Sequence, residues 1–314
     1  VADSVVRIGK RDVTAPEVRP SPSQWRYRRK LTLALRREGT AWRAGLHPYD
    51  DPAAVFSLHD CPITSERVME VWREIMAASA DLPDALELRG AVRVAGEGAT
   101  CVIEGGRTWA HSGVFFHRVR SLTALWWSGD GKPRKLLHNR QSGQAPGASF
   151  AQVNTEVAAA LRRHVLDLTL AYTPMTAIDA YAGLGDLSAA LQERGVAVTA
   201  IELDPEASAW CARRLTGRSH AVTGRAEDLV PEELPADVLI LNPPRAGIDE
   251  RLAGSLEKTL DAPRALLYVS CNPATLARDL ARMPRYRVTS LLAFDMFPQT
   301  AHVETVCELV PDPI

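Results

Sequence analysis

Short apolar runs alternate with helix-like segments through the second half of the chain. Runs that end in turns lie at 176–183, 196–204, 236–247 and 264–272, and a stretch with the apolar spacing of a helix follows each one. Near-continuous apolar strands that alternate with helices predict a mostly parallel sheet covered on both faces. Ligands of such sheets bind where the carboxyl ends of neighbouring strands meet. We therefore expect the chemistry of this half at its strand-ending turns.

The first half has a different pattern, with short strand-like runs separated by glycines and turns. One helix is predicted at 63–79, where apolar residues recur at helical spacing. Residues 128–148 are rich in Gly and polar residues and predict a loop or hairpin before a boundary. A helix at 153–171, capped by Asn154 or Thr155, then follows. We expect an α+β domain at 1–150 and an α/β domain at 151–314.

Composition and charge narrow the class of protein. The 314 residues are 46% hydrophobic and 24% charged, as in soluble globular proteins, and no apolar run reaches the length of a membrane helix. Residues 1–150 carry 22 Lys or Arg against 16 Asp or Glu, whereas the remainder carries 15 against 22. A basic half suggests that this half meets a polyanion. Five scattered cysteines without CxxC spacing favour a reducing cytoplasm. We expect a cytoplasmic monomer.

The basic segment RYRRK, at 26–30, interleaves cations with aromatic residues. That pattern suits phosphate contacts with base stacking. It is equally typical of an edge strand protected by charge, and the residues alone favour neither interpretation.

Two features of the α/β half indicate a nucleoside-containing cofactor. The turn DAYAGLGD, 179–186, holds two glycines that let the backbone approach a ligand closely. Glu202 ends the next strand, where a carboxylate can accept both ribose hydroxyls. Ser188 stands where a dinucleotide-binding fingerprint has its third glycine. The glycine turn and Glu202, without that third glycine, therefore favour S-adenosylmethionine over NAD as the cofactor.

Three further strand ends carry candidate chemistry. Asn242 precedes two prolines in LNPPRAG, which specify a rigid turn. Cys271 lies between an apolar strand and a helix that begins with Pro273, so the helix dipole is expected to lower its pKa. Glu304 begins the last strand. From the residues alone, a packed thiol and a surface carboxylate remain the more common alternatives.

The motifs SCNPATLARD, FPQTAHVETV, NPPRAG and DAYAGLGD together resemble the RNA uracil methyltransferase family that makes 5-methyluridine in transfer RNA and large-subunit ribosomal RNA. The resemblance spans nearly the whole chain. It implies a Rossmann-like class I methyltransferase domain, with a mostly parallel seven-stranded sheet, preceded by a smaller α+β central domain that contacts RNA. It also implies S-adenosylmethionine as cofactor and RNA as partner.

The resemblance assigns roles residue by residue. Cys271 is implied as the nucleophile that adds to carbon 6 of uracil, and Glu304 as the base that removes the carbon 5 proton. The implied cofactor contacts are Gln152, Tyr181, Asp186, Glu202 and Asn242.

The chain departs from the family pattern in ways that concern function. Asn242 stands where most members have Asp, and Arg225 stands where many methyltransferases have an acidic or amide residue. Cys61, in HDCPI, matches the fourth ligand of the family's iron–sulfur cluster, while the usual upstream cysteines and oligonucleotide-binding barrel are not in this sequence. We expect Cys61 to be an orphaned ligand, with a cluster possible only in a longer chain.

Two other functions compete with uridine methylation. An amino-group methyltransferase also uses an NPP turn but has no need of Cys271. An RNA-binding protein with a vestigial pocket would tolerate the changes at Asn242 and Arg225.

Overall fold

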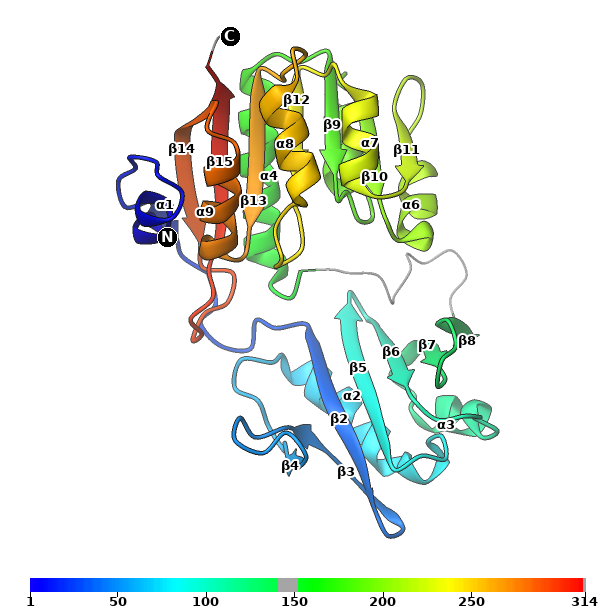
Figure 1. Ribbon diagram of the computed structural model, residues 1–314. Helices are drawn as coiled ribbons and strands as arrows, with labels where there is room; N and C mark the ends of the chain where they lie inside the picture. The colour runs from blue at the N-terminus through cyan, green and yellow to red at the C-terminus, as the bar shows by residue number, and fades with distance from the viewer. Residues whose placement is uncertain (141–151, 313–314) are drawn as a thin grey trace. The chain divides into compact units, whose positions relative to one another are not determined.

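The computed structural model describes residues 1–140 and 152–312. The chain divides into two compact units. The α/β unit comprises Val1–Pro22 and Ser149–Ile314, and the insert unit comprises Ser23–Ala148. Each has its own hydrophobic core, and Figure 1 shows the elements of both.

The α/β unit is built on an eight-stranded sheet with the order β1-β14-β15-β13-β12-β9-β10-β11. All neighbouring pairs are parallel except those that β15 makes with β13 and β14. The central strands β12 and β13 are buried along their whole length, as expected for strands covered on both faces. The strands are β1 (Glu17–Arg19), β9 (Thr176–Ala180), β10 (Ala197–Glu202), β11 (His220–Thr223), β12 (Val238–Leu241), β13 (Ala265–Ser270), β14 (Tyr286–Phe294) and β15 (Glu304–Pro311).

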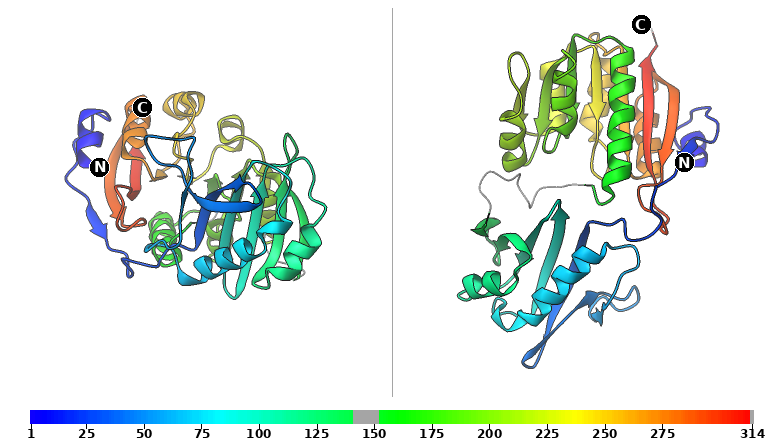
Figure 2. Two further views of the ribbon diagram at one scale, coloured as in Figure 1. Left: turned by 90° about the horizontal axis from the view of Figure 1, so that it is seen from below. Right: turned by 180° about the vertical axis from the view of Figure 1, so that it is seen from behind.

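Helices cover both faces of this sheet. One face packs against α4, α5 and α6, and the other against α1, α7, α8 and α9. Figure 2, at right, shows α4 lying along its face of the sheet. The helices are α1 (Ala2–Arg7), α4 (Thr155–Ala171), α5 (Asp186–Gln192), α6 (Pro205–Ala212), α7 (Ala226–Glu233), α8 (Glu250–Lys258) and α9 (Pro273–Arg282). The side chain of Asn154 caps α4, as one of the two predicted caps.

The first 22 residues belong to the α/β unit. This assignment differs from the prediction, which placed all of residues 1–150 in the α+β domain. Strand β1 pairs in parallel with β14 and adds an eighth strand to the seven expected. Helix α1 packs against α9. Arg11 donates to the carbonyls of Leu280, at 3.0 Å, and Met283, at 2.9 Å, near the end of α9. Each of these carbonyls also accepts from a backbone N–H, Leu280 O from Met283 N and Met283 O from Tyr286 N, so Arg11 supplies a second, charged donor to each.

The insert unit is a seven-stranded sheet in the order β4-β3-β2-β5-β6-β7-β8, antiparallel except between β6 and β7. Strand β2 alternates buried and half-buried residues because one face of the sheet packs against α2. The elements are β2 (Lys30–Glu38), β3 (Ala41–Leu46), β4 (Phe56–Ser57), α2 (Glu66–Ala77), the 3-10 helix η1 (Ser79–Asp81), β5 (Glu87–Ala95), β6 (Gly98–Glu104), α3 (Ser112–Arg118), β7 (Leu122–Ser128) and β8 (Lys135–Asn139).

Several expected elements coincide with those observed. The helix expected at 63–79 is α2, and the hairpin expected at 128–148 includes β8, although 141–148 lie outside the described residues. None of the helices in the described ranges is long and apolar enough to cross a membrane.

We predict that Arg11→Ala lowers the free energy of unfolding by about 2 kcal/mol, because three carbonyls near the end of α9 lose a charged donor. Urea unfolding of the full chain measures the change. Arg7→Ala is the control, since its ion pair with Asp3 is 3.7 Å long and exposed, and it should cost less than about 0.5 kcal/mol. Equal losses in the two variants would contradict the capping role.

Candidate active site

The predicted residues follow five neighbouring strands at one edge of the α/β sheet. Glu202 ends β10, Tyr181 follows β9, Asn242 follows β12 and Cys271 follows β13. Glu304 begins β15, which runs antiparallel to β13. The carboxyl ends of the parallel strands and the amino end of β15 therefore share one edge, and Figure 1 shows these strands side by side.

The glycine turn and the acidic residue meet as the sequence predicts. The carboxylate of Glu202 accepts a hydrogen bond from Gly183 N at 2.8 Å and from Asp204 N at 2.8 Å. Tyr181 has a φ of 65°, a backbone conformation that costs energy for a residue with a side chain. Gly183 has a φ of 58°, and a Cβ there would meet no atom within 4 Å. The turn is thus open toward a ligand.

Ser188 explains why the third glycine of a dinucleotide fingerprint is absent. Its hydroxyl donates to the carboxylate of Asp179 at 2.6 Å, and both side chains are buried. Burial raises the pKa of Asp179 to about 6, so a glycine at 188 would leave a costly carboxylate without that donor. Gly185 is needed because a Cβ there would clash with Cys211 of α6.

A buried carboxylate holds the NPPRAG turn in place. Asp279, on α9, is fully buried and accepts hydrogen bonds from Tyr268 Oη at 2.7 Å and Ile248 N at 2.9 Å. Its neighbour Arg278 pairs with the same carboxylate and donates to Ala246 O at 2.7 Å. The turn that carries Arg245 is thereby fixed to the helix that begins just after Cys271. Arg278 and Asp279 stand in the SCNPATLARD motif, but the motif alone does not predict this role.

The SCNP motif fixes the loop that carries Cys271. Ser270 Oγ accepts from Asn272 N at 3.1 Å and donates to Asn272 O at 3.0 Å. The Asn272 side chain caps α9 by accepting from Ala274 N at 3.1 Å. Thr305 Oγ1 donates to Ser270 O at 3.1 Å, which ties β15 to this loop.

Glu304 is 3% exposed, which excludes the surface-charge alternative. The register pairs Ser270 with Thr305, so Cys271 and Glu304 are the next residues along the two strands. Burial raises the pKa of Glu304 to about 7, and Arg245 opposes the rise. One oxygen, Oε2, has no hydrogen-bond partner among the described residues. A carboxyl group of this kind is half-ionised near neutral pH and free to accept a proton from a ligand.

The pKa of Cys271 is raised, so the expected lowering by the helix dipole is wrong. Burial is the largest cause, and the nearby carboxylate of Glu304 adds to it. Arg245 lowers the pKa through its charge and a hydrogen bond, but does not reverse the shift. The thiol is half-buried and neutral at pH 7 until a partner removes its proton.

The other predicted residues have less defined surroundings. Gln152 is half-buried just before α4. The carboxylate of Asp186 is engaged by Arg214 at 2.7 Å and Arg162 at 3.3 Å. Cys61 is half-buried in the insert unit, and the described residues contain no group of His, Cys, Asp or Glu able to hold a metal. Their cofactor and cluster roles stay predictions.

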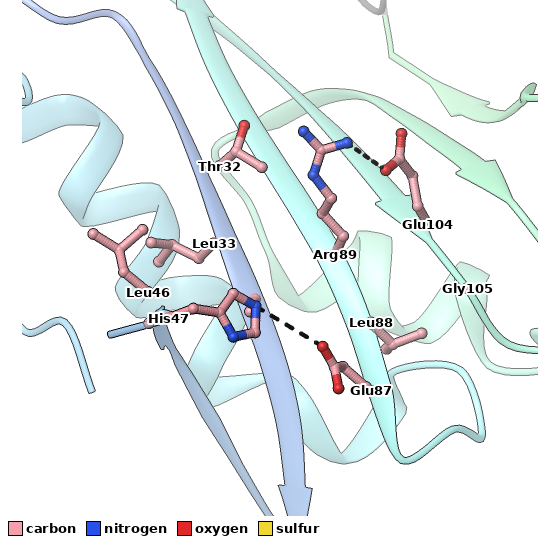
Figure 3. Close-up of a pocket in the computed structure, with 11 residues that line it drawn as sticks. Thr32, Leu33, Leu46, His47, Glu87, Leu88, Arg89, Glu104 and Gly105 are labelled. Atoms are coloured by element: carbon pink, nitrogen blue, oxygen red, sulfur yellow. Dashed lines mark hydrogen bonds and ion pairs between the residues drawn. The ribbon is translucent and has the colours of Figure 1, made fainter. Parts of the chain in front are cut away.

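A cavity of about 430 Å³ in the insert unit contains none of the predicted site residues. Its ionisable side chains face one another in pairs: Arg89 lies 2.9 Å from Glu104, and His47 lies 3.9 Å from Glu87 (Figure 3). The strand ends of the α/β sheet therefore remain the candidate active site.

Comparisons with known proteins agree with the fold and the motifs. The family model described as tRNA (Uracil-5-)-methyltransferase matches residues 218–310. An uncharacterized RNA methyltransferase of Halalkalibacterium halodurans is 29% identical over 98% of this chain and 76% of its own length. A 23S rRNA (uracil(747)-C(5))-methyltransferase of Shewanella loihica is 40% identical over 51% of this chain, a match that spans only 44% of that enzyme.

A solved structure shares the fold of nearly the whole chain. The tRNA (uracil-54, C5)-methyltransferase of Pyrococcus abyssi, in complex with S-adenosyl-L-homocysteine, superposes with a TM-score of 0.73 at 22% identity. The match covers 98% of this chain and 81% of that chain. The fold is thus that of a class I methyltransferase with an added β-rich unit. Residues 218–310 thus match the model of the uracil-5 methyltransferases, and nearly the whole chain is similar to an RNA methyltransferase in sequence and to a tRNA uracil-5 methyltransferase in fold.

We predict that Gly247→Ala destabilises the α/β unit by roughly 1–3 kcal/mol. Gly247 has a φ of 78°, and a Cβ there would clash with the buried Asp279 carboxylate. The clash should also displace the turn that carries Arg245 and lower the rate of methyl transfer. Gly254→Ala in α8 is the control, because a Cβ there meets no atom within 4 Å and should stabilise by about 0.5–1 kcal/mol. Equal urea midpoints for the two variants would refute the clash.

We predict that Glu304→Gln stabilises the fold above pH 7 by up to about 3 kcal/mol, at about 1.4 kcal/mol per pKa unit. Folding raises the pKa of this carboxyl from 4.5 to about 7, so ionised Glu304 opposes folding at high pH. The gain should shrink as pH falls from 7 to 4.5 and vanish below, where the carboxyl is protonated in both states. Urea unfolding at several pH values measures it. The exposed Glu250→Gln should show no such gain, and a pH-independent gain in Glu304→Gln would contradict the assignment.

Proposed function

We propose that this chain methylates carbon 5 of a uridine in tRNA or rRNA through a covalent Cys271–uracil adduct. One observation carries the proposal: a half-buried thiol and a buried, incompletely bonded carboxyl group lie together at the sheet edge, next to the open glycine turn. A simple binding protein has no use for Glu304 in that position, since burying it costs stability.

The two groups have complementary roles. The Cys271 thiolate adds to carbon 6 of the uracil, and the electron pair of the ring double bond moves onto the carbon 4 oxygen as an enolate. Carbon 5 thereby becomes nucleophilic. After methylation, the Glu304 carboxylate takes the proton of carbon 5, and the returning electron pair expels the thiolate. The pKa of about 7 suits Glu304 to this step, because the carboxylate is both present and basic near neutral pH.

Arg245 assists both groups as a positioning residue. Its positive charge lowers the pKa of Cys271 and of Glu304, which favours thiolate and carboxylate together. The Asp279 network holds the turn from which this side chain extends. Asn242 lies on the same turn, and its backbone N donates to Ala180 O at 3.3 Å, which ties it to the end of β9, just before the glycine turn.

The residues at the sheet edge fit S-adenosylmethionine. Glu202 would accept the ribose hydroxyls, the turn at Tyr181 and Gly183 would lie against the cofactor, and Gln152 and Asp186 are further expected contacts. Bound S-adenosylmethionine supplies an electrophilic methyl group, which carbon 5 accepts. A hydrogen bond from the Asn242 amide is one that an aspartate in its place would not donate.

The alternatives remain distinct in their chemistry. An amino-group methyltransferase would leave Cys271 and Glu304 without a task. An RNA-binding protein with a vestigial pocket would bind RNA and transfer no methyl group. The similarity to uracil-5 methyltransferases and the adjacency of Cys271 and Glu304 favour the enzyme.

We predict that the chain transfers label from methyl-labelled S-adenosylmethionine to uridine-containing RNA, and that Cys271→Ala abolishes transfer. Glu304→Gln should slow turnover roughly 10²–10⁴-fold and accumulate an RNA–protein adduct that survives a denaturing gel, since the carbon 5 proton is no longer removed.

Glu308→Gln is the matched control, because Glu308 lies on the same strand but bonds to Tyr172 and Thr289. It should turn over without trapping RNA. An adduct that persists in the Cys271→Ala/Glu304→Gln double variant would contradict the mechanism. Methyl label on an exocyclic amine would favour amino-group transfer, and RNA binding without transfer would favour the vestigial pocket.

A further inference from the structure

The positive charge of the insert unit is concentrated in one segment. Residues 107–140 contain seven Lys or Arg against one Asp, whereas residues 23–106 contain 11 Lys or Arg against 12 Asp or Glu. The segment also contains His111, His117 and His138. The excess of positive charge in the first half of the chain therefore comes from residues 107–140 and not from the RYRRK segment and its neighbours.

We call the surface of residues 107–140 the cationic face. It comprises α3, the β7–β8 hairpin and the loops that join them. Helix α3 packs on β8, where His138 Nε2 lies 3.1 Å from Ser112 Oγ. Strand β8 is the edge strand of its sheet, and Figure 1 shows α3 beside it.

The cations of the cationic face are exposed, and three of them make no ion pair with a described carboxylate. All seven Lys and Arg side chains are exposed. Arg118 binds the carboxylate of Asp81 at 2.7 Å. Arg107, Arg120 and Lys132 make no ion pair with any carboxylate in the described part of the chain. Exposed cations without counterions are the electrostatic pattern of a phosphate-binding surface.

Aromatic rings make cation–π contacts with some of these cations. Lys135 Nζ lies 5.2 Å from the centroid of the Trp127 ring, and the Arg140 guanidinium lies 4.2 Å from that of Phe116. Phe116 in turn stacks on His138 with centroids 5.2 Å apart. Arg140 also donates to backbone carbonyls, among them Phe116 O at 2.6 Å and Arg120 O at 2.7 Å. These contacts hold the long side chains in place, so a partner loses less side-chain entropy on binding.

Two other cations of the insert unit, Arg26 and Arg89, are neutralised by carboxylates. Arg26, in RYRRK, makes two bonds of 2.6 and 2.8 Å to Asp60 and a third of 3.1 Å to Cys61 O. It is therefore a structural clamp. The cavity in Figure 3 pairs Arg89 with Glu104 and so offers little net charge.

We propose that the cationic face binds the sugar–phosphate backbone of the RNA substrate. The proposal rests on the proposed function, which makes RNA the substrate, and identifies the surface that docks it. Contacts to phosphates position an RNA without reading its sequence. The cationic face therefore contributes affinity, whereas the sheet edge carries out the chemistry.

The test is the triple variant Arg107→Gln, Arg120→Gln, Lys132→Gln in the full chain. Its dissociation constant for a uridine-containing stem–loop RNA should rise roughly tenfold or more at 0.1 M salt. The slope of log affinity against log salt should fall by about 2–3, one phosphate contact for each lost charge. The single-turnover rate of methyl transfer at saturating RNA should not change.

The matched control is Arg194→Gln, Arg218→Gln, Lys258→Gln, which removes the same charge. These exposed residues precede β10, β11 and β13, at the edge of the sheet opposite the candidate site. RNA affinity of this variant should equal that of wild type. Equal affinities for the two triple variants would overturn the proposal. Unchanged RNA affinity with lost binding to phosphatidylserine vesicles would also overturn it and assign the cationic face to a membrane.

The test of RNA binding by the cationic face can fail independently of the test of the proposed methyl transfer. RNA binding is measured without S-adenosylmethionine and does not depend on Cys271 or Glu304. Absence of methyl transfer with salt-dependent binding through the cationic face would refute the proposed reaction alone. Methyl transfer with unchanged binding in the triple variant would refute the cationic face alone.

Discussion

The antiparallel return of β15 between β13 and β14 is the constraint on which the candidate site depends. A parallel strand in that position would present its carboxyl end at the site edge, and Glu304, its first residue, would lie at the opposite edge. Because β15 runs the other way, its first residue arrives beside Cys271 at the end of β13. The bond from Thr305 Oγ1 to Ser270 O fixes that register locally. A strand slip of one residue would turn Glu304 to the other face of the sheet.

Several groups of the site are in conformations or surroundings that lower the stability of the fold, and neighbouring interactions must offset this cost. Glu304 is buried with an oxygen that lacks a partner, and Tyr181 has a strained backbone. Burial of Cys271 beside a carboxylate disfavours the thiolate. The buried carboxylate of Asp279, by contrast, accepts hydrogen bonds from Tyr268 and Ile248 and fixes the NPPRAG turn to the helix that follows Cys271. A rigid polar support thus lies beside reactive groups that gain their partners only when a substrate is bound.

Much of this arrangement could be predicted from local sequence. Strand ends, the glycine turn and Glu202 depend on patterns a few residues long, and the structure brings them together as expected. The pairing of β1 with β14 could not be predicted, because it joins residues about 275 positions apart and β1 has only three residues. The roles of Arg245 and Asp279 could not be predicted, because they depend on contacts between separate turns. The pKa of Cys271 was predicted in the wrong direction because a helix terminus is visible in sequence, whereas burial and the charge of Glu304 are not.

The position of the insert unit between β1 and α4 has a consequence for the order in which the protein folds. The insert unit is one contiguous segment, Ser23–Ala148, so it can complete its core while the ribosome is still adding the rest of the chain. The α/β unit is discontinuous. Its first strand, β1, leaves the ribosome early but has no partner until β14 is synthesised near the end. The α/β sheet therefore closes late, by contacts of high sequence separation, and during synthesis β1 is an unpaired edge.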